Sequence, residues 1–142
     1  MTFTEKIMDL GVLTPAGHIY PKQVIQQSID DFIQSKMICF IIIGSPDTFG
    51  IDLTKVVAKA EKLWINQNAL MAELYQFSGP SSVIYNNLRG LPGIKLVGYG
   101  LNGLGSYEKD GHTIKNFKLT SISFISIPAK SMAQRVSDML LN

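Results

Sequence analysis

The seven apolar residues from Met37 to Ile43 constrain the fold of this chain more than any other feature. The run stops at Gly44-Ser45-Pro46, residue types that end a strand, so it predicts a strand buried on both of its faces. The loop that follows contains Asp47 and Asp52. A buried strand that carries a small polar residue at its exit is one way to build an active site, so the part played by Ser45 is the first question that the sequence raises.

The composition predicts one globular domain, residues 1–142, because 46% of the 142 residues are hydrophobic and 17% are charged. The net charge is only +2 and no Lys/Arg stripe is visible, which argues against a nucleic-acid partner. No apolar run approaches the roughly 20 residues that cross a bilayer, and the N-terminus lacks the apolar core of a secretion signal. We therefore expect a cytosolic protein with no membrane partner.

The sequence predicts neither a metal site nor a cofactor. Its two histidines lie far apart, and its single cysteine, Cys39, falls inside the apolar run. A thiol in such a position is typical of a reduced core residue, and a lone cysteine with scattered histidines does not make a metal site.

The segment before the apolar run has a helical pattern, and the segment after it has an ambiguous one. After Pro21, apolar residues recur with a helical period and predict an amphipathic helix with Val24, Ile25, Ile29, Phe32 and Ile33 on its inner face. The later block 55–79 is rich in Ala, Lys, Glu and Leu, which favours a helix. Asn66-Gln67-Asn68 interrupts that block, however, so two strands around a turn compete with the helix, and composition leaves both open.

The C-terminal half reads as a short helix, a glycine-rich stretch, a strand and a tail. Pro80 and Gly90 mark the entry and the exit of the helix. The glycines between 98 and 111 imply tight turns or a close approach of two backbones. Leu119, Ser121, Ser123 and Ile125 then alternate with Thr120, Ile122, Phe124 and Ser126, which predicts a strand, and residues 130–142 fit a closing helix.

Three separated pieces of the sequence, taken in order, resemble the capsid-maturation (prohead) protease family of T-even-type tailed phages. "GHIYPKQVIQQSIDDFI" is similar to the family's Arg/Lys-x-Tyr-Pro-Lys and the helix after it. The strand that ends at Gly44-Ser45-Pro46 is followed by Asp52, Glu61 and Trp64 at the family's spacing. "GLGSY" and "NFKLTSISFISIPA" resemble the family's next glycine motif and strand, so the likeness runs from Gly17 to about Ala129.

The resemblance implies an α+β fold, a small and mostly antiparallel β-barrel flanked by helices, like that of herpesvirus assemblin. It also decides the ambiguous block in favour of a hairpin, with strands at Val56–Asn66 and Ala69–Phe77. We expect Trp64, Tyr75 and Phe77 in the core of this barrel rather than on a surface that stacks with bases.

At the positions where the resemblance places the family's catalytic residues, this sequence has other residue types. These proteases are serine hydrolases in which a histidine acts as general base, and the family histidine precedes a proline at the position of Ser45. The family serine falls on Gly100, and no serine occurs anywhere from Ile94 to Asn102. A serine hydroxyl is no base near neutral pH, and glycine offers no nucleophile. No catalytic residue is therefore expected, and Ser45 is expected to cap a turn beside Pro46.

Other residues offer alternatives to this interpretation. Ser106 is a candidate for a displaced nucleophile with His112 or His18 as its base, although a turn serine, an exposed turn histidine and a surface histidine are the expected assignments. Asp47 and Asp52 form a second candidate pair, against the expectation of solvated loop carboxylates. "GLNGLG" is similar to a dinucleotide loop but lacks the flanking strand, the helix and the acidic residue of such a site.

The resemblance implies a non-catalytic structural or assembly protein of the phage capsid, which binds capsid or scaffold proteins. It would act in the host cytoplasm during assembly, or remain in the virion head. The alternatives are an active prohead protease with a rearranged site, a regulatory subunit of an active paralogous protease, and a homo-oligomer. An unrelated α+β binding module would follow if Val56–Phe77 were one continuous helix.

Overall fold

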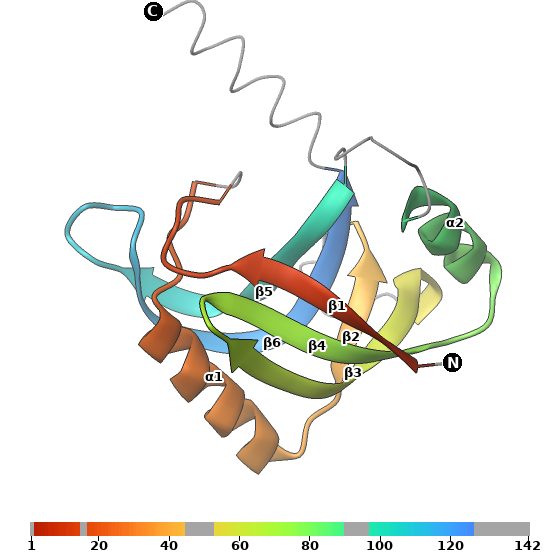
Figure 1. The fold of residues 1–142 in the computed structure, drawn as a ribbon, viewed down its shortest axis with the longest axis horizontal. Helices are drawn as coiled ribbons and strands as arrows, with labels where there is room; N and C mark the ends of the chain where they lie inside the picture. The colour runs from red at the N-terminus through yellow and green to blue at the C-terminus, as the bar shows by residue number, and fades with distance from the viewer. Residues whose placement is uncertain (1, 15–16, 45–52, 90–96, 127–142) are drawn as a thin grey trace, which may run out of the picture.

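The computed structural model describes residues 2–14, 17–44, 53–89 and 97–126 of the chain. The elements in chain order are β1 (Thr2–Asp9), α1 (Lys22–Ser35), β2 (Cys39–Ile43), a 3₁₀ turn (Leu53–Lys55), β3 (Val56–Asn66), β4 (Ala69–Gln76), α2 (Pro80–Arg89), β5 (Val97–Tyr107) and β6 (Ile114–Ser126). The strands form a six-stranded sheet in the order β1-β4-β3-β2-β6-β5, and α1 and α2 lie at opposite ends of it and pack into one core (Figure 1). Within the described ranges, no helix has the length and hydropathy needed to cross a membrane.

The predicted α+β class and the mostly antiparallel sheet are confirmed. Every ladder is antiparallel except that between β2 and β6. The sheet is twisted, but β1 and β5 are its two edges and no ladder joins them among the described strands. The expected closure into a barrel is therefore not observed in this part of the chain, and β1 is a strand that the sequence pattern did not predict.

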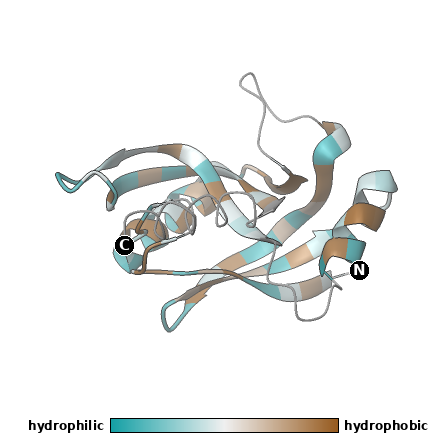
Figure 2. Cartoon of the chain, turned by 90° about the horizontal axis from the view of Figure 1, so that it is seen from above, coloured by the Kyte–Doolittle hydropathy of each residue, from teal (hydrophilic) through white to brown (hydrophobic). Residues whose placement is uncertain are grey.

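The β3–β4 hairpin confirms the choice of two strands for the ambiguous block. A two-residue turn at Gln67 and Asn68 joins them, and Gln67 adopts a positive φ of 56° there. Alternate residues of β4 are buried in the core, as period two requires, and these are Leu70, Ala72 and Leu74. Hydropathy alternates along the strands in the same way (Figure 2).

The three aromatic residues expected in the core do not belong to it. Trp64 is only partly buried, and it pairs with Met71 at a position of β3 whose neighbours in sequence, Leu63 and Ile65, pack on the core. Tyr75 is exposed and meets Phe77 edge to face, with Lys59 over its ring. The prediction was wrong because period two places these side chains on the outer side of the sheet.

Strand β2 is buried on both faces, as predicted, but it is shorter than the apolar run. Ile41 and Ile42, which point to opposite faces, are both almost inaccessible. Met37 and Ile38 are each 54% exposed. They precede the strand because α1 ends at Ser35 and the chain reverses through Lys36 in the left-handed region before it enters the sheet.

The two helices are attached to the sheet by different contacts. Helix α1 buries Ile25, Ser28, Ile29 and Phe32, and its Ser28 hydroxyl accepts a hydrogen bond from the Leu119 N–H at 3.2 Å. Ile33 was predicted on that face, but it lies at the helix end and is 61% exposed.

Helix α2 bridges the two edge strands, where no ladder joins them. The Tyr85 and Tyr99 hydroxyls lie 2.7 Å apart, which ties α2 to β5. The Arg89 Nε donates to Glu5 of β1 at 3.1 Å, and its guanidinium stacks 3.9 Å from the centre of the Phe3 ring. Burial raises the pKa of both tyrosines, so their hydroxyls stay protonated at neutral pH.

The glycine-rich stretch combines both predicted uses of glycine: Gly103 and Gly105 of strand β5 permit a close approach of two backbones, and Gly111, with a φ of 80°, lies in the turn before β6. A Cβ on Gly103 would lie 2.1 Å from the Lys118 carbonyl oxygen and 2.7 Å from the Phe117 ring. Any side chain at this position would therefore push β5 away from β6.

A β-bulge in β6 changes which residues share a face. Asn102 pairs with Ser121 whereas Gly103 pairs with Leu119, so Thr120 is the extra residue. Leu119 consequently joins Ile122 and Phe124 in the core. The predicted uninterrupted alternation, with Leu119, Ser121 and Ser123 on one face, was wrong for this reason.

Candidate functional site

Gly100, the position that the family resemblance assigns to the catalytic serine, lies close to the exit of β2, because both are next to one residue of β6. Ser123 pairs with Gly100 of β5 on one side and with Ile42 of β2 on the other. Strand β2 ends just beyond, where the Gly44 N–H donates to the Phe124 carbonyl at 3.1 Å. Gly100 and the exit of β2 are thus separated by a single strand, while Ser45 lies outside the described residues.

A buried polar cluster occupies this part of the sheet. The Asn102 Nδ2 donates to the Ser121 Oγ at 3.0 Å and to the Ser123 Oγ at 2.7 Å. The bulged Thr120 donates from its hydroxyl to the Asn102 carbonyl at 3.0 Å. Both serines are buried, at 1% and 3% exposure. We call Asn102, Ser121 and Ser123 the Asn102 network; it links β5 to β6 beside Gly100.

The Asn102 network contains hydroxyls but no base. An asparagine amide has two N–H donors, both of which are engaged here, and it takes up no proton near neutral pH. A serine becomes a nucleophile only when a base removes its proton. Among the described residues, no histidine or carboxylate is hydrogen-bonded to either serine. The arrangement stabilises the pairing of two strands and lacks the groups for proton transfer.

The alternative catalytic residues are not assembled into a site. Ser106 lies exposed on β5 opposite Asn116, in a strand rather than the expected turn. His112 is the exposed turn residue that was predicted, with its Nε2 3.4 Å from Asp110. His18 lies against Tyr107, with its Nδ1 3.2 Å from the phenolic oxygen. Neither histidine is hydrogen-bonded to the Ser106 hydroxyl in the described part of the chain.

Asp110 organises the turn that carries His112. Hydrogen bonds from the side chain and backbone of Thr113, and from the backbone of His112, lower the pKa of Asp110 to about 2. A carboxylate that is held in its charged form by its own turn is a turn cap, not a general acid. Asp47 and Asp52, the other acidic candidates, lie outside the described residues.

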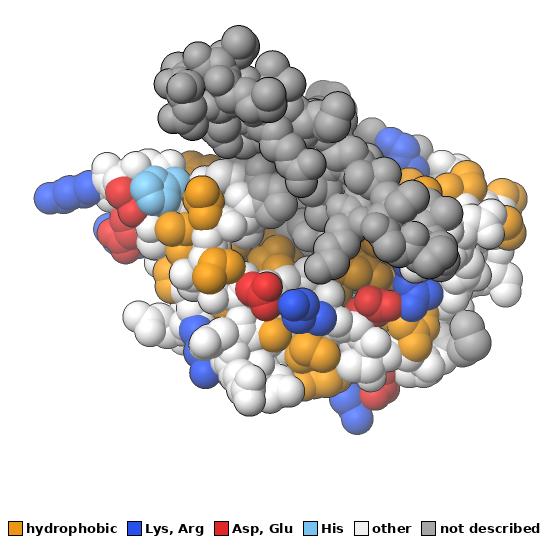
Figure 3. All heavy atoms as spheres, turned by 45° about the horizontal axis from the view of Figure 1, so that its top comes forward, with side chains coloured by type: hydrophobic (Ala, Val, Ile, Leu, Met, Phe, Trp, Pro, Cys, Tyr) orange, Lys and Arg blue, Asp and Glu red, His pale blue; other side chains and the backbone are white. Residues whose placement is uncertain are grey.

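The described residues contain no group of three or more His, Cys, Asp or Glu side chains that could hold a metal ion. Cys39 is buried in β2, and burial raises the pKa of its thiol to about 12, which disfavours the reactive thiolate at neutral pH. Charges of both signs are interspersed on the face in Figure 3, without a basic stripe along it.

Comparison with known proteins identifies the fold. No protein-family profile matches the chain, and no curated protein matches it. Among solved structures, the chain is similar to the capsid assembly protease gp21 of bacteriophage T4, with a TM-score of 0.69 and 20% sequence identity. The match covers 88% of this chain and 81% of that chain. The described α+β fold is therefore similar to that of a phage capsid assembly protease.

The Asn102 network is the part of this region that sequence reasoning missed. Ser121 and Ser123 were predicted to lie on a strand, but Asn102 was not connected to them. The usable signal was a pair of serines at period two in an otherwise apolar strand, since buried hydroxyls need hydrogen-bond partners.

Proposed function

We propose that this chain is a non-catalytic protein of phage capsid assembly, built on a prohead-protease fold, which acts by binding capsid or scaffold chains. The observation that supports this most is the composition of the sheet around Gly100. Where the family resemblance puts a nucleophile, the chain has a glycine beside two buried serines that accept hydrogen bonds from an amide, and no described residue acts as a base on either serine.

The likeness to a capsid assembly protease supports the biological setting of this proposal. Such a protein would work in the host cytoplasm while capsids assemble. Proteases of this kind bind the chains that they cut. A related protein without catalytic residues would therefore still bind capsid or scaffold proteins.

A cleavage assay tests the proposal. The purified full chain is incubated with the capsid and scaffold proteins encoded in the same genome, and all new termini are mapped by mass spectrometry. We expect no cleavage above the level without the chain, and the same result for the Ser106→Ala, His18→Ala and His112→Ala variants. Cleavage at a defined bond that any of these substitutions abolishes would establish a rearranged active site instead.

A further inference from the structure

Half of strand β3 has no partner on the side of β2. Val56 to Ala60 pair with β2, but among the described strands none pairs with Glu61–Asn66 on that side. On their other side, Lys62 to Asn66 are paired with β4, and Glu61 is the extra residue of a bulge. The cause is the late start of β2, because Met37 and Ile38 precede the strand and lead back to α1.

The unpaired half of β3 offers free backbone groups. Asn66 and Ala69 flank the two-residue turn of the hairpin, so the backbone N–H and C=O groups of Asn66 point toward β4. Along β3 these groups point alternately toward and away from β4. The N–H and C=O groups of Leu63 and Ile65 therefore point away from β4, toward the open side. No described residue forms a hydrogen bond with these groups. An unpaired strand edge is a template for a further strand.

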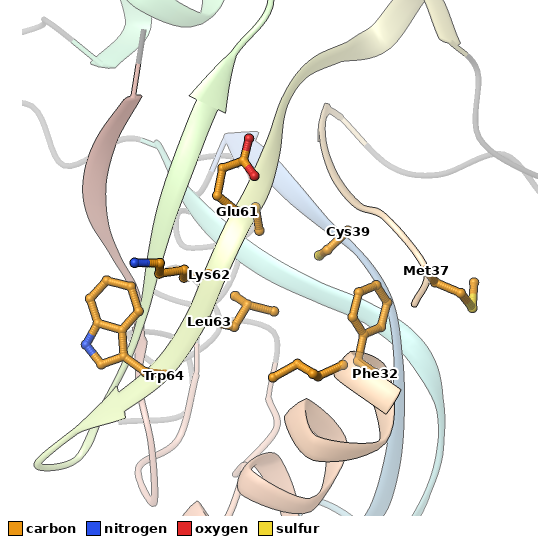
Figure 4. A pocket seen from close by; sticks show the side chains of 9 residues that line it. Phe32, Met37, Cys39, Glu61, Lys62, Leu63 and Trp64 are labelled. Carbon is orange, nitrogen blue, oxygen red and sulfur yellow. The ribbon is translucent and has the colours of Figure 1, made fainter. Parts of the chain in front are cut away.

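A hollow of about 490 Å³ lies against this edge. It is bounded by the end of α1, the start of β2 and the middle of β3, and we call it the β3 groove; its lining residues are Phe32, Ile33, Met37, Cys39, Ala60, Glu61, Lys62, Leu63 and Trp64. In Figure 4 the Leu63 side chain points toward Phe32 and Cys39, whereas the side chains of Lys62 and Trp64 point to the other side of β3. The groove therefore combines a backbone edge with a lining that is mostly apolar and includes two charged residues of that edge.

The apolar side chains at the rim of the groove contribute little to the core of the monomer. Ile33, Met37 and Ile38 are each more than half exposed, although the sequence pattern predicted that all three would be buried. Neighbouring exposed apolar residues beside a concave surface are typical of an interaction site.

The geometry restricts what can occupy the groove. A strand pairs at about 4.8 Å from its neighbour, whereas a helix is about 10 Å wide and presents no free backbone groups to an edge. Helix α1 forms the opposite wall, so a single extended segment fits better than the edge of a second sheet. Strand β6 runs parallel to β2, so Ser126, the last described residue, lies at the opposite end of β2 from the groove.

We infer that the β3 groove binds an extended segment of a partner polypeptide, which adds as a strand to Glu61–Ile65 and places apolar side chains in the hollow. The inference rests on the proposed function, and it identifies the partner as a capsid or scaffold chain. Main-chain hydrogen bonds supply affinity in this mode of recognition, and pockets for alternate side chains supply specificity.

Peptide binding to the full-length protein tests the inference. Short overlapping peptides that cover the capsid and scaffold chains of the same genome are measured by fluorescence anisotropy, together with a peptide of residues 127–142 of this chain. We expect a capsid or scaffold peptide with alternating apolar residues to bind. Ile33→Glu and Met37→Glu should each weaken it about tenfold or more. The matched control Val83→Glu, at an equally exposed apolar residue of α2, should have no effect.

Hydrogen exchange distinguishes strand addition from adhesion to an apolar surface. The bound peptide should protect the amides of Leu63 and Ile65, while those of Trp64 and Asn66, which face β4, should exchange as before. Binding without that protection would overturn the inference, as would binding of the 127–142 peptide alone, dimerisation through the groove, or no binding at all. A peptide that binds in this way and is then cleaved would leave the groove intact and overturn only the proposed function.

Discussion

The two ends of β2 differ in whether the backbone and side-chain groups around them have partners within the described structure. At the exit, Gly44 is bonded to β6, and the Asn102 network beside Gly100 has its amide donors engaged. At the entry, Glu61–Asn66 of β3 pair with no described strand on the side of β2, and Ile33, Met37 and Ile38 are exposed. The proposed binding surface and Gly100 are therefore at different ends of β2, so the proposed binding does not require catalytic residues at the exit end.

The largest expected effect concerns the thiol of Cys39 at the entry end. Its pKa of about 12, against an ordinary 9.0, makes the reactive thiolate about a thousandfold rarer near pH 8. The rate of reaction with a disulfide reagent should fall by about that factor relative to the unfolded chain in urea. A native rate within tenfold of the unfolded one would show that the groove gives solvent access to Cys39.

The next largest effect is expected from removing the amide at the exit end. Asn102→Ala leaves two buried serine hydroxyls without their donor, so we expect a loss of about 2 kcal/mol in the free energy of unfolding. Adding Ser121→Ala and Ser123→Ala should recover much of it, because no unsatisfied hydroxyl then remains. Denaturant unfolding measures the loss in Asn102→Ala and the recovery in the triple variant. An unaltered midpoint for Asn102→Ala would mean that the Asn102 network does not stabilise the exit end of β2.

The pH dependence of stability should report the burial of Cys39. The unfolded chain loses the thiol proton near pH 9, while the folded chain keeps it up to about pH 12. The contribution of this thiol to the free energy of unfolding is therefore fully present below pH 9, and it decreases above pH 9 by about 1.4 kcal/mol per pH unit. Urea unfolding between pH 8 and 10 should show a shallower slope for Cys39→Ala, and an equal slope in both proteins would contradict this assignment.

The smallest effect is expected at the rim of the groove. Ile33→Ala and Met37→Ala should change the free energy of unfolding by less than about 0.5 kcal/mol, because both side chains are more than half exposed. Thermal unfolding checks this. A loss as large as that of Asn102→Ala would show that these residues belong to the core and would remove the contrast between the two ends.

Local patterns in the sequence were sufficient for several elements. The helical period before Ser35 predicted α1, and the Pro80 entry predicted α2. The family resemblance was needed for the β3–β4 hairpin, whose Ala- and Lys-rich composition favours a helix. Strand β1 was missed because its partner is distant, with Thr2 opposite Tyr75. Non-local pairing leaves little trace in the strand itself.

The candidate sites depended on features that the sequence does not display. The bulge at Thr120 shifts the alternation by one residue and so decides which side chains Asn102 meets. The apolar run from Met37 does not reveal that its first two residues stay outside the sheet. That late start of β2 leaves the β3 edge open, so the groove follows from where a strand begins rather than from any motif.

Mass spectrometry of assembled shells distinguishes a binding protein from a protease. Capsid and scaffold chains are co-expressed with and without this chain, the shells are purified, and the termini of every chain are mapped. We predict shells that contain this chain without internal cleavage, and no capsid or scaffold cleavage that depends on it. A trimmed chain, together with new capsid termini that disappear when the chain is omitted, would contradict the proposed function and identify a working protease.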